Sequence, residues 1–404
     1  MEIIEKLRAL GSAAKYDICA ATGCNGSPRS RAPAQGAVCH SFLPDGRCIS
    51  LFKMLQTNSC QKDCYYCPNR VQRDIPRTGF KPEELAGIFL DFYRRNYVEG
   101  LFLSSGICGS SSQSMEQMLK TVEILRLKYK YTGYIHLKIL PGARFDYVER
   151  AVNLATRVSI NVEAPTASHL KKISTLKNFQ KEIINRLQWV HDLSQKGKLP
   201  AGQTTQFIVG ASGETDSEIL QASTRLYQSV GLRRAYFSAF QPVADTPLEN
   251  IPAAPVLREH RLYQSDFLIR HYGFTLPEIY FEKGGNLSLD LDPKMNFAIN
   301  NLHLYPVEIN KASLRELLRV PGIGPVSARR IINARREFRL NNLDELKNIG
   351  LVLKKAAPFI QVNGHYRESH KLIQQLSFWS DNGDNPAQLN PFLSAQSCHA
   401  VPAV

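Results

Sequence analysis

The segment Thr57–Arg70 reads TNSCQKDCYYCPNR and places three cysteines within eight residues. Its spacing, C-x3-C-x2-C, supplies three sulfur ligands and no fourth. A structural zinc site and a four-iron cluster each normally take four protein ligands. The segment therefore predicts a metal centre at Cys60, Cys64 and Cys67 that is completed by a ligand from elsewhere.

The three cysteines follow a predicted strand and begin a pattern of alternating strands and helices. Such a pattern is typical of a parallel sheet covered by helices, with the active site at the C-terminal ends of the strands. We therefore expect an α/β fold, a partial (β/α)6 barrel, with the cysteines at its mouth. The predicted strands are 48–56, 100–106, 133–140, 157–163, 204–210 and 235–241, and the predicted helices are 82–97, 114–131, 145–155, 167–193, 214–230 and 254–271.

Composition limits the class of protein further. The chain has 404 residues, 43% of them hydrophobic, which is enough for one large domain and a smaller one. No run of about 18 apolar residues occurs, and the start, MEIIEKLRALGSAAKYDICAATG, lacks the pattern of a signal peptide, so we expect a cytoplasmic protein. The net charge of +14 favours a polyanionic partner such as nucleic acid, and a basic surface without a specific ligand is the alternative.

The cysteine segment resembles the signature of the radical S-adenosylmethionine superfamily, C-x3-C-x-aromatic-C, with Tyr66 as the aromatic residue. The resemblance implies that three thiolates hold a 4Fe–4S cluster and that S-adenosylmethionine chelates the fourth iron. It also implies an enzyme that forms a 5'-deoxyadenosyl radical. A zinc site completed by an N-terminal ligand is the alternative, which the strand-helix context disfavours.

Four further segments resemble the cofactor-binding strand ends of that superfamily: LSSG (103–106), NVEAPT (161–166), FIVGASGET (207–215) and YFSAFQPVADTPL (236–248). The first departs from the usual Gly-Gly-Glu, so only its backbone contacts carry over. Glu163 could instead cap the next helix, and Lys138 is either a ligand contact or a solvated lysine. No catalytic residue is identified. The residues that the resemblance assigns to cofactor binding are Tyr66, Ser104, Ser105, Gly106, Asn161, Glu163, Gly210, Tyr236, Phe237 and Ser238.

Two helical patterns near the C-terminus are separated by PGIGP (321–325). Gly322 and Gly324 allow a tight turn, and the following helix N-terminus offers unpaired amides to an anion. This resembles a helix-hairpin-helix motif, which implies nucleic-acid binding through Gly322, Gly324 and the basic Arg329 and Arg330. A packing or protein-docking module is the alternative. A degenerate second hairpin is expected at 346–360, with Asn348 and Gly350 in place of the two glycines.

These patterns suggest five parts of the chain. They are an N-terminal cysteine-containing segment (1–47), the barrel (48–279), a linker (280–308), a small all-α helix-hairpin-helix domain (309–362) and a tail (363–404). The N-terminal segment holds Cys19, Cys24 and Cys39, and Cys48 follows it. An auxiliary metal site at these four residues stays open, because their spacing fits no standard zinc finger and a buried thiol explains Cys48 equally well.

Segments along nearly the whole chain, including CHSFLPDGRCISLFKMLQTNSC (39–60) and LDPKMNFAINN (291–301), resemble a family of DNA modification or repair radical SAM proteins. Members are typically encoded beside a uracil-DNA-glycosylase-like protein. The resemblance implies a DNA base or nucleotide as substrate and that protein as a candidate partner. Two alternatives stay open: a radical SAM enzyme acting on RNA, and a DNA-binding protein whose cluster is structural or redox-sensing.

Overall fold

The structure is a computed structural model that describes residues 2–14, 37–42, 48–195 and 197–366. The chain divides into two compact units, Met1–Tyr263 and Gln264–Val404.

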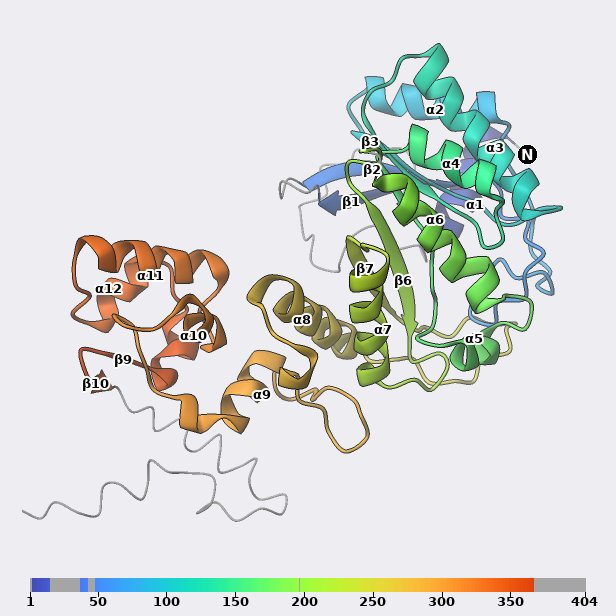
Figure 1. Cartoon of the computed structure of the whole chain (residues 1–404). Helices are drawn as coiled ribbons and strands as arrows, with labels where there is room; N and C mark the ends of the chain where they lie inside the picture. The colour runs from blue at the N-terminus through green and yellow to red at the C-terminus, as the bar shows by residue number, and fades with distance from the viewer. Residues whose placement is uncertain (1, 15–36, 43–47, 196, 367–404) are drawn as a thin grey trace, which may run out of the picture. The chain divides into compact units, whose positions relative to one another are not determined.

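The first unit contains a seven-stranded sheet in the order β1 to β7 (Figure 1). Strands β2 to β7 are parallel, which confirms the partial barrel of six parallel strands. The additional strand, β1, pairs antiparallel with β2 and was missed because it lies next to a segment rich in Gly, Pro and Ser. The strands are β1 (Val38–Phe42), β2 (Cys48–Leu55), β3 (Gly100–Ser104), β4 (Tyr134–Lys138), β5 (Arg157–Ser159), β6 (Gln203–Val209) and β7 (Arg234–Ala239).

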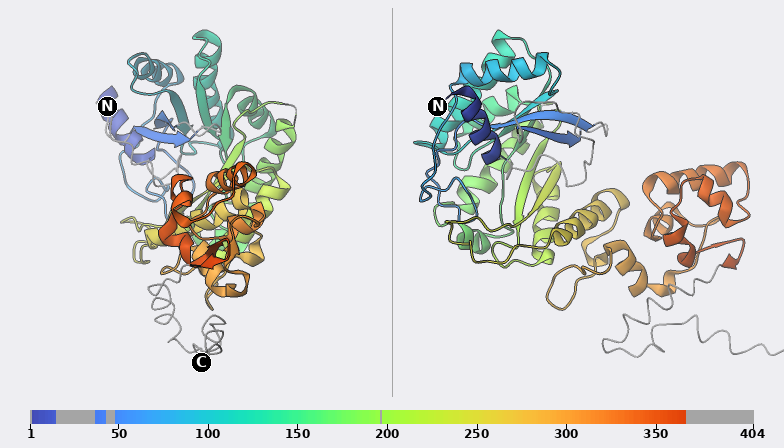
Figure 2. Two further views of the ribbon diagram at one scale, coloured as in Figure 1. Left: turned by 90° about the vertical axis from the view of Figure 1, so that its left-hand side faces the viewer. Right: turned by 180° about the vertical axis from the view of Figure 1, so that it is seen from behind.

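Amphipathic helices cover the outer face of this sheet, and α1 lies against β2 (Figures 1 and 2). Strands β3 and β6 are buried along their whole length, as expected for parallel strands with both faces covered. On the outer face, the Phe52 ring lies 5.0 Å from the ring of Phe92 in α2. The helices are α1 (Ile3–Ala14), α2 (Pro82–Arg94), α3 (Ser111–Glu123), α4 (Phe145–Leu154), α5 (Ala167–Ile173), α6 (Asn185–Ser194) and α7 (Asp216–Ser229), and π-helical turns occupy Ile124–Lys128 and Phe179–Ile184. Helix α8 (Val256–Tyr272) begins in this unit and ends in the second.

The single helix predicted over 167–193 is wrong, because the chain leaves helical geometry between α5 and the π-helical turn. The cause is the buried carboxylate of Asp63, which accepts hydrogen bonds from the Ser174 hydroxyl at 2.6 Å and the Thr175 amide at 2.8 Å. The Thr175 hydroxyl and the Leu176 amide also donate to it, at 2.7 and 3.4 Å. These two amides therefore bind a carboxylate instead of continuing the helical hydrogen-bond pattern.

The second unit has its own hydrophobic core, to which Leu317, Ile331 and Phe359 contribute. The segment expected to be a linker contributes Tyr305 and Val307 to the same core. The helical character of the region is confirmed, but three short strands add a small sheet in the order β10, β9, β8. The elements are α9 (Pro293–Asn300), β8 (Val307–Glu308), α10 (Leu314–Arg319), α11 (Pro325–Glu337), α12 (Leu343–Asn348), α13 (Leu353–Ala356), β9 (Ile360–Val362) and β10 (His365–Tyr366), with 3-10 turns at Leu276–Glu278, Leu302–Leu304 and Ala357–Phe359.

Among the helices in the described part of the chain, none combines the length and the apolar content needed to cross a membrane.

Replacing Asp63 by Asn should lower the free energy of unfolding of the metal-free protein by roughly 2–3 kcal/mol at pH 7, because charge-assisted hydrogen bonds are lost. Burial acts to raise the pKa of Asp63, but the bonds from Ser174, Thr175 and Leu176 hold it below its usual 3.8. A depressed pKa stabilises the fold above the unfolded-state pKa, and this contribution is lost as the pH falls through the folded-state value. Urea unfolding should thus give a constant wild-type advantage above about pH 5 that shrinks below about pH 4. An equal advantage at every pH would contradict this assignment.

Candidate functional site

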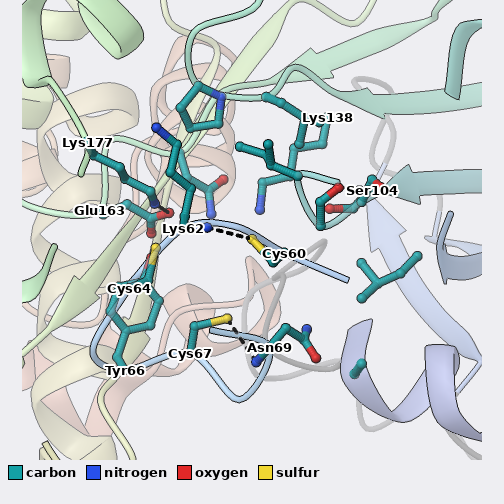
Figure 3. A pocket seen from close by; sticks show the side chains of 18 of the residues that line it. Cys60, Lys62, Cys64, Tyr66, Cys67, Asn69, Ser104, Lys138, Glu163 and Lys177 are labelled. Carbon is teal, nitrogen blue, oxygen red and sulfur yellow. Dashed lines mark hydrogen bonds and ion pairs between the residues drawn. The ribbon is translucent and has the colours of Figure 1, made fainter. Parts of the chain in front are cut away.

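A pocket lies at the C-terminal ends of strands β2 to β6, and all three cysteines of the signature line it (Figure 3). Figure 3 shows Lys138, Glu163 and Lys177 around the same space as the cysteine side chains. The structure thus brings together residues from four strand ends and the cysteine segment. The sequence-predicted residues that line the pocket are Cys60, Cys64, Tyr66, Cys67, Ser104, Ser105, Gly106, Lys138, Asn161 and Glu163.

The cysteine segment is held in shape by Arg77. Its Nη1 donates hydrogen bonds to the carbonyls of Asn58 and Asn69, at 2.7 and 2.9 Å. Its Nη2 donates to the carbonyls of Arg70 and Arg73, at 2.7 and 2.9 Å. One guanidinium group thereby ties the beginning of the segment to its end.

The segment after β3 packs directly against the cysteine segment. The Gly106 amide donates to the Thr57 carbonyl at 2.8 Å, and the Gln61 amide donates to the Ile107 carbonyl at 2.8 Å. A Cβ atom on Gly106 would lie 2.3 Å from the Ser59 carbonyl oxygen. Only glycine therefore allows the backbone after β3 to approach this closely.

The three thiols are free, and all of them line the same pocket. The Lys62 amide donates to the Sγ of Cys60 at 3.5 Å, and the Asn69 amide donates to the Sγ of Cys67 at 3.4 Å. Such N–H···S bonds stabilise metal-bound thiolates and tune the cluster potential. Without metal, burial raises the pKa of Cys64 and raises that of Cys67 to about 12. The donor set fits three thiolate ligands of a 4Fe–4S cluster.

A buried ion pair forms the wall of the pocket beside Cys64. The Nζ of Lys177 lies 3.2 Å from the Oε1 of Glu163, and both side chains are only 6% exposed. Burial lowers the pKa of Lys177, but the nearby Cys64 and Glu163 groups raise it above its usual value overall. The Glu163 Oε2 has no hydrogen-bond partner among the described residues. This unpaired acceptor could take a hydroxyl or amine of a bound ligand.

Glu163 does not cap the following helix. Thr166 is the N-cap of α5 and accepts a hydrogen bond from the His169 amide at 3.3 Å. Glu163 instead adopts a φ of +68° and bridges to Phe207 of β6. The capping alternative is therefore wrong, and this carboxylate faces the pocket.

Sequence reasoning missed Lys177, because no motif marks it and the expected helix would have placed it on an ordinary helical turn. The position of Lys177 depends on where the helix ends, and the Asp63 carboxylate sets that end by binding Thr175. These two residues are more than a hundred positions apart in the chain. The one local signal is the pair Ser174 and Thr175, which often end helices by competing for backbone hydrogen bonds.

The structure does not place Gly210, Tyr236, Phe237 and Ser238 along the pocket. Gly210 has a φ of +93°, and a Cβ there would lie 2.8 Å from the Ala254 Cβ, so it serves a tight turn. The Phe237 ring faces away and packs 5.1 Å from the ring of Tyr263. The Tyr263 hydroxyl also hydrogen-bonds the backbone amide and carbonyl of Phe237, both at 3.0 Å, so this backbone is already paired.

A separate candidate site lies in the second unit, at the hairpin between α10 and α11. Gly322 has a φ of +82°, and a Cβ there would lie 2.7 Å from the Val352 carbonyl oxygen. Gly322 is thus required for packing within the module. Gly324 is the N-cap of α11 with a φ of −99°, which other residues can adopt.

The N-terminus of α11 has free amides. Pro325 has no N–H, and no described residue accepts a hydrogen bond from the amides of Gly324, Val326 or Ser327. Unpaired amides and the helix dipole together favour an anion at this position. Arg329 and Arg330 are both exposed and lie one turn further along the helix, where they add positive charge; Arg330 also donates to the Ile349 carbonyl at 3.2 Å.

The second hairpin is present, but its expected alignment was wrong. Gly350, with a φ of +90°, stands two residues before the N-cap Val352 of α13, as Gly322 stands two residues before Gly324. Gly350 therefore matches Gly322, and Val352 matches Gly324. Asn348 is the last residue of α12 and has no counterpart among the two glycines.

Comparison with protein families agrees with both sites. Residues 54–226 match the model of the radical SAM superfamily, and residues 305–360 match that of a helix-hairpin-helix motif. The chain therefore carries a radical SAM domain followed by a helix-hairpin-helix module. Enzymes of the radical SAM superfamily use a 4Fe–4S cluster and S-adenosylmethionine, and residues 54–226 carry the domain that this superfamily shares. Comparison with curated protein sequences finds no match.

Several solved structures are similar over about half of this chain. Methylornithine synthase (PylB) has a TM-score of 0.44 and 14% identity, covering 53% of this chain and 60% of that chain. The FeFe-hydrogenase maturase HydG from Carboxydothermus hydrogenoformans has a TM-score of 0.42 and 13% identity, covering 53% and 50%. The radical S-adenosylmethionine methyltransferase TsrM from Kitasatospora setae has a TM-score of 0.38 and 10% identity, covering 48% and 38%. This chain spans about half to three fifths of the first two structures.

The auxiliary metal site is not placed. Cys19 and Cys24 lie outside the described residues. Cys39 is in β1 opposite Leu51, and Cys48 begins β2 opposite Phe42. The two described positions thus lie toward opposite ends of the β1–β2 ladder.

Replacing Cys60, Cys64 or Cys67 by Ala should each remove most of the bound iron, because the signature has no spare thiolate. Iron content and visible absorption after anaerobic reconstitution measure the loss. Cys108→Ala is the matched control, since Cys108 is a free, exposed cysteine outside the signature. A variant of the three that kept full iron and cleaved S-adenosylmethionine would exclude that cysteine as a ligand.

Proposed function

We propose that this chain is a radical SAM enzyme that acts on a base or nucleotide of nucleic acid, with DNA as the favoured substrate. The observation that supports it best is the presence, on one chain of net charge +14, of a radical SAM pocket and a helix N-terminus with three unpaired amides. The pocket would carry out the reaction, and the α11 N-terminus would bind phosphate independently of sequence.

In the pocket, Cys60, Cys64 and Cys67 would hold the cluster, and the bound cofactors would supply the 5'-deoxyadenosyl radical that abstracts a substrate hydrogen atom. The chain's own contribution is position and shielding. Glu163 offers an unpaired carboxylate oxygen to a cofactor hydroxyl or amine, and the ion pair with Lys177 orients that carboxylate.

At the hairpin, a backbone phosphate would accept hydrogen bonds from the amides of Gly324, Val326 and Ser327. Arg329 adds a positive charge nearby, since it is exposed and forms no ion pair with a described residue. Contacts of this kind position the nucleic acid without reading its sequence and weaken with salt.

The choice of DNA rests on the resemblance to DNA modification or repair radical SAM proteins. The same resemblance makes a uracil-DNA-glycosylase-like protein a candidate partner. An RNA substrate uses the same amide contacts, and a binding protein with a structural cluster uses the same hairpin, so both are outcomes of the test below.

Anaerobic incubation of the reconstituted protein with S-adenosylmethionine, a reductant and deuterated DNA should give 5'-deoxyadenosine that contains deuterium. Mass spectrometry of the nucleosides should show the altered base or sugar. Deuterium transfer only from a labelled RNA pool would establish the RNA alternative. A fully loaded cluster that gave no 5'-deoxyadenosine would favour the binding protein.

Val326→Glu should weaken binding of duplex DNA of any sequence by about tenfold, because a carboxylate at the α11 N-terminus repels phosphate. Val326→Gln is the matched control, since Val326 is 60% exposed and the two side chains have nearly equal size. The acidic variant should not be less stable, because negative charge favours a helix N-terminus. Fluorescence anisotropy and thermal unfolding measure the two effects, and equal affinity of both variants would make the hairpin a packing element. Substitution of Gly322 is a weaker test of phosphate binding, because it also disrupts the packing against Val352.

A further inference from the structure

A lysine from outside the hairpin motif lies directly on the hairpin. The Nζ of Lys294, in α9, donates a hydrogen bond to the Ile323 carbonyl at 2.5 Å. The same ammonium lies 4.7 Å from the centre of the Tyr272 ring. Among the described residues, Lys294 forms no ion pair with a carboxylate; the neighbouring Asp292 pairs with Lys355 at 3.1 Å.

The carbonyl that Lys294 contacts belongs to the peptide between Ile323 and Gly324. In a planar trans peptide, the C=O and the N–H point in opposite directions. A cation on the oxygen therefore polarises the peptide and strengthens its amide as a donor on the other side. That amide belongs to Gly324, one of the three that have no acceptor among the described residues.

Tyr272 connects the lysine to the same turn. A Cβ placed on Gly324 would lie 3.3 Å from the Tyr272 hydroxyl. Tyr272 therefore contacts the turn with its hydroxyl and faces the ammonium with its ring. A cation held between an aromatic ring and a backbone carbonyl, without a direct ion pair to a carboxylate, leaves its charge available to a bound anion.

We propose that Lys294 is part of the phosphate site of the hairpin, where its ammonium strengthens the Gly324 amide and attracts a phosphodiester of nucleic acid. This inference rests on the proposed nucleic-acid role of the hairpin. It adds a residue from α9, in the segment that the sequence analysis took for a linker.

The site should bind nucleic acid in a pH-dependent way. Burial lowers the pKa of Lys294 to about 7, with Asp292 acting to raise it and Arg319 to lower it further. The other groups packed near it are Tyr272 of α8 and Lys355 of α13, which binds Asp292. A bound phosphate favours the charged ammonium, so binding takes up a proton where free Lys294 is neutral. The affinity for nucleic acid is therefore highest below about pH 7 and decreases as the pH rises above it.

The test measures the affinity of the full chain for a fluorescein-labelled DNA duplex between pH 6 and pH 8.5 at constant ionic strength. The wild type should lose about tenfold in affinity over this range, and Lys294→Met should bind weakly at both ends. Lys294→Arg should bind tightly at both ends, because a guanidinium group keeps its charge. Lys311→Met, which removes an exposed lysine of the same unit, is the control for net charge.

A Lys294→Met variant with the affinity and pH profile of the wild type would overturn the inference. So would a Lys294→Arg variant that melts at the wild-type temperature but binds as weakly as Lys294→Met. These outcomes leave the nucleic-acid role intact, provided that Val326→Glu still binds less tightly than Val326→Gln. A wild type that binds neither DNA nor RNA would overturn both.

Discussion

The pocket depends on the hydrogen bonds that the Asp63 carboxylate accepts from the backbone after α5. This carboxylate lies within the cysteine segment, one residue before Cys64, and binds the backbone at Thr175 and Leu176. This contact ends a helix early and directs the chain so that Lys177 reaches Glu163. A single buried acid therefore connects the cysteine segment to the opposite wall of the pocket. Its hydrogen bonds replace those that the interrupted helix would have made.

A feature could be predicted from the sequence when the residues that determine it lie close together along the chain. The six parallel strands and the three cysteines depend on local periodicity and spacing, and these expectations agree with the structure. Strand β1 was missed because it lies next to a segment of turn-forming composition, and its pairing with β2 is not visible in the sequence. Phe237 was expected at the pocket only from the resemblance of its strand, and its ring packs against Tyr263 instead. Lys177 and Lys294 depend on tertiary contacts that no local pattern contains.

The two glycines of the hairpin have different roles, although the sequence presents them as a pair. Gly322 permits close packing against the second hairpin, whereas the Gly324 amide has no acceptor within the part of the chain that the structure describes. In the second hairpin, Gly350 keeps the packing turn and Val352 replaces the second glycine; the Val352 amide donates to the Gly322 carbonyl at 3.4 Å. One hairpin is therefore available to an anion, and the other supports it.

The hydrogen bonds from Arg77 order the cysteine segment before any metal is bound. In a zinc finger, the ligand loop has no other support, so metal binding and folding are one event. Here the carbonyls of Asn58, Asn69, Arg70 and Arg73 are already held by protein groups. The free energy of cluster assembly is not consumed in ordering the loop. Damage to the cluster by oxygen and its repair can thus proceed on a folded chain, without a cycle of unfolding that would expose the core.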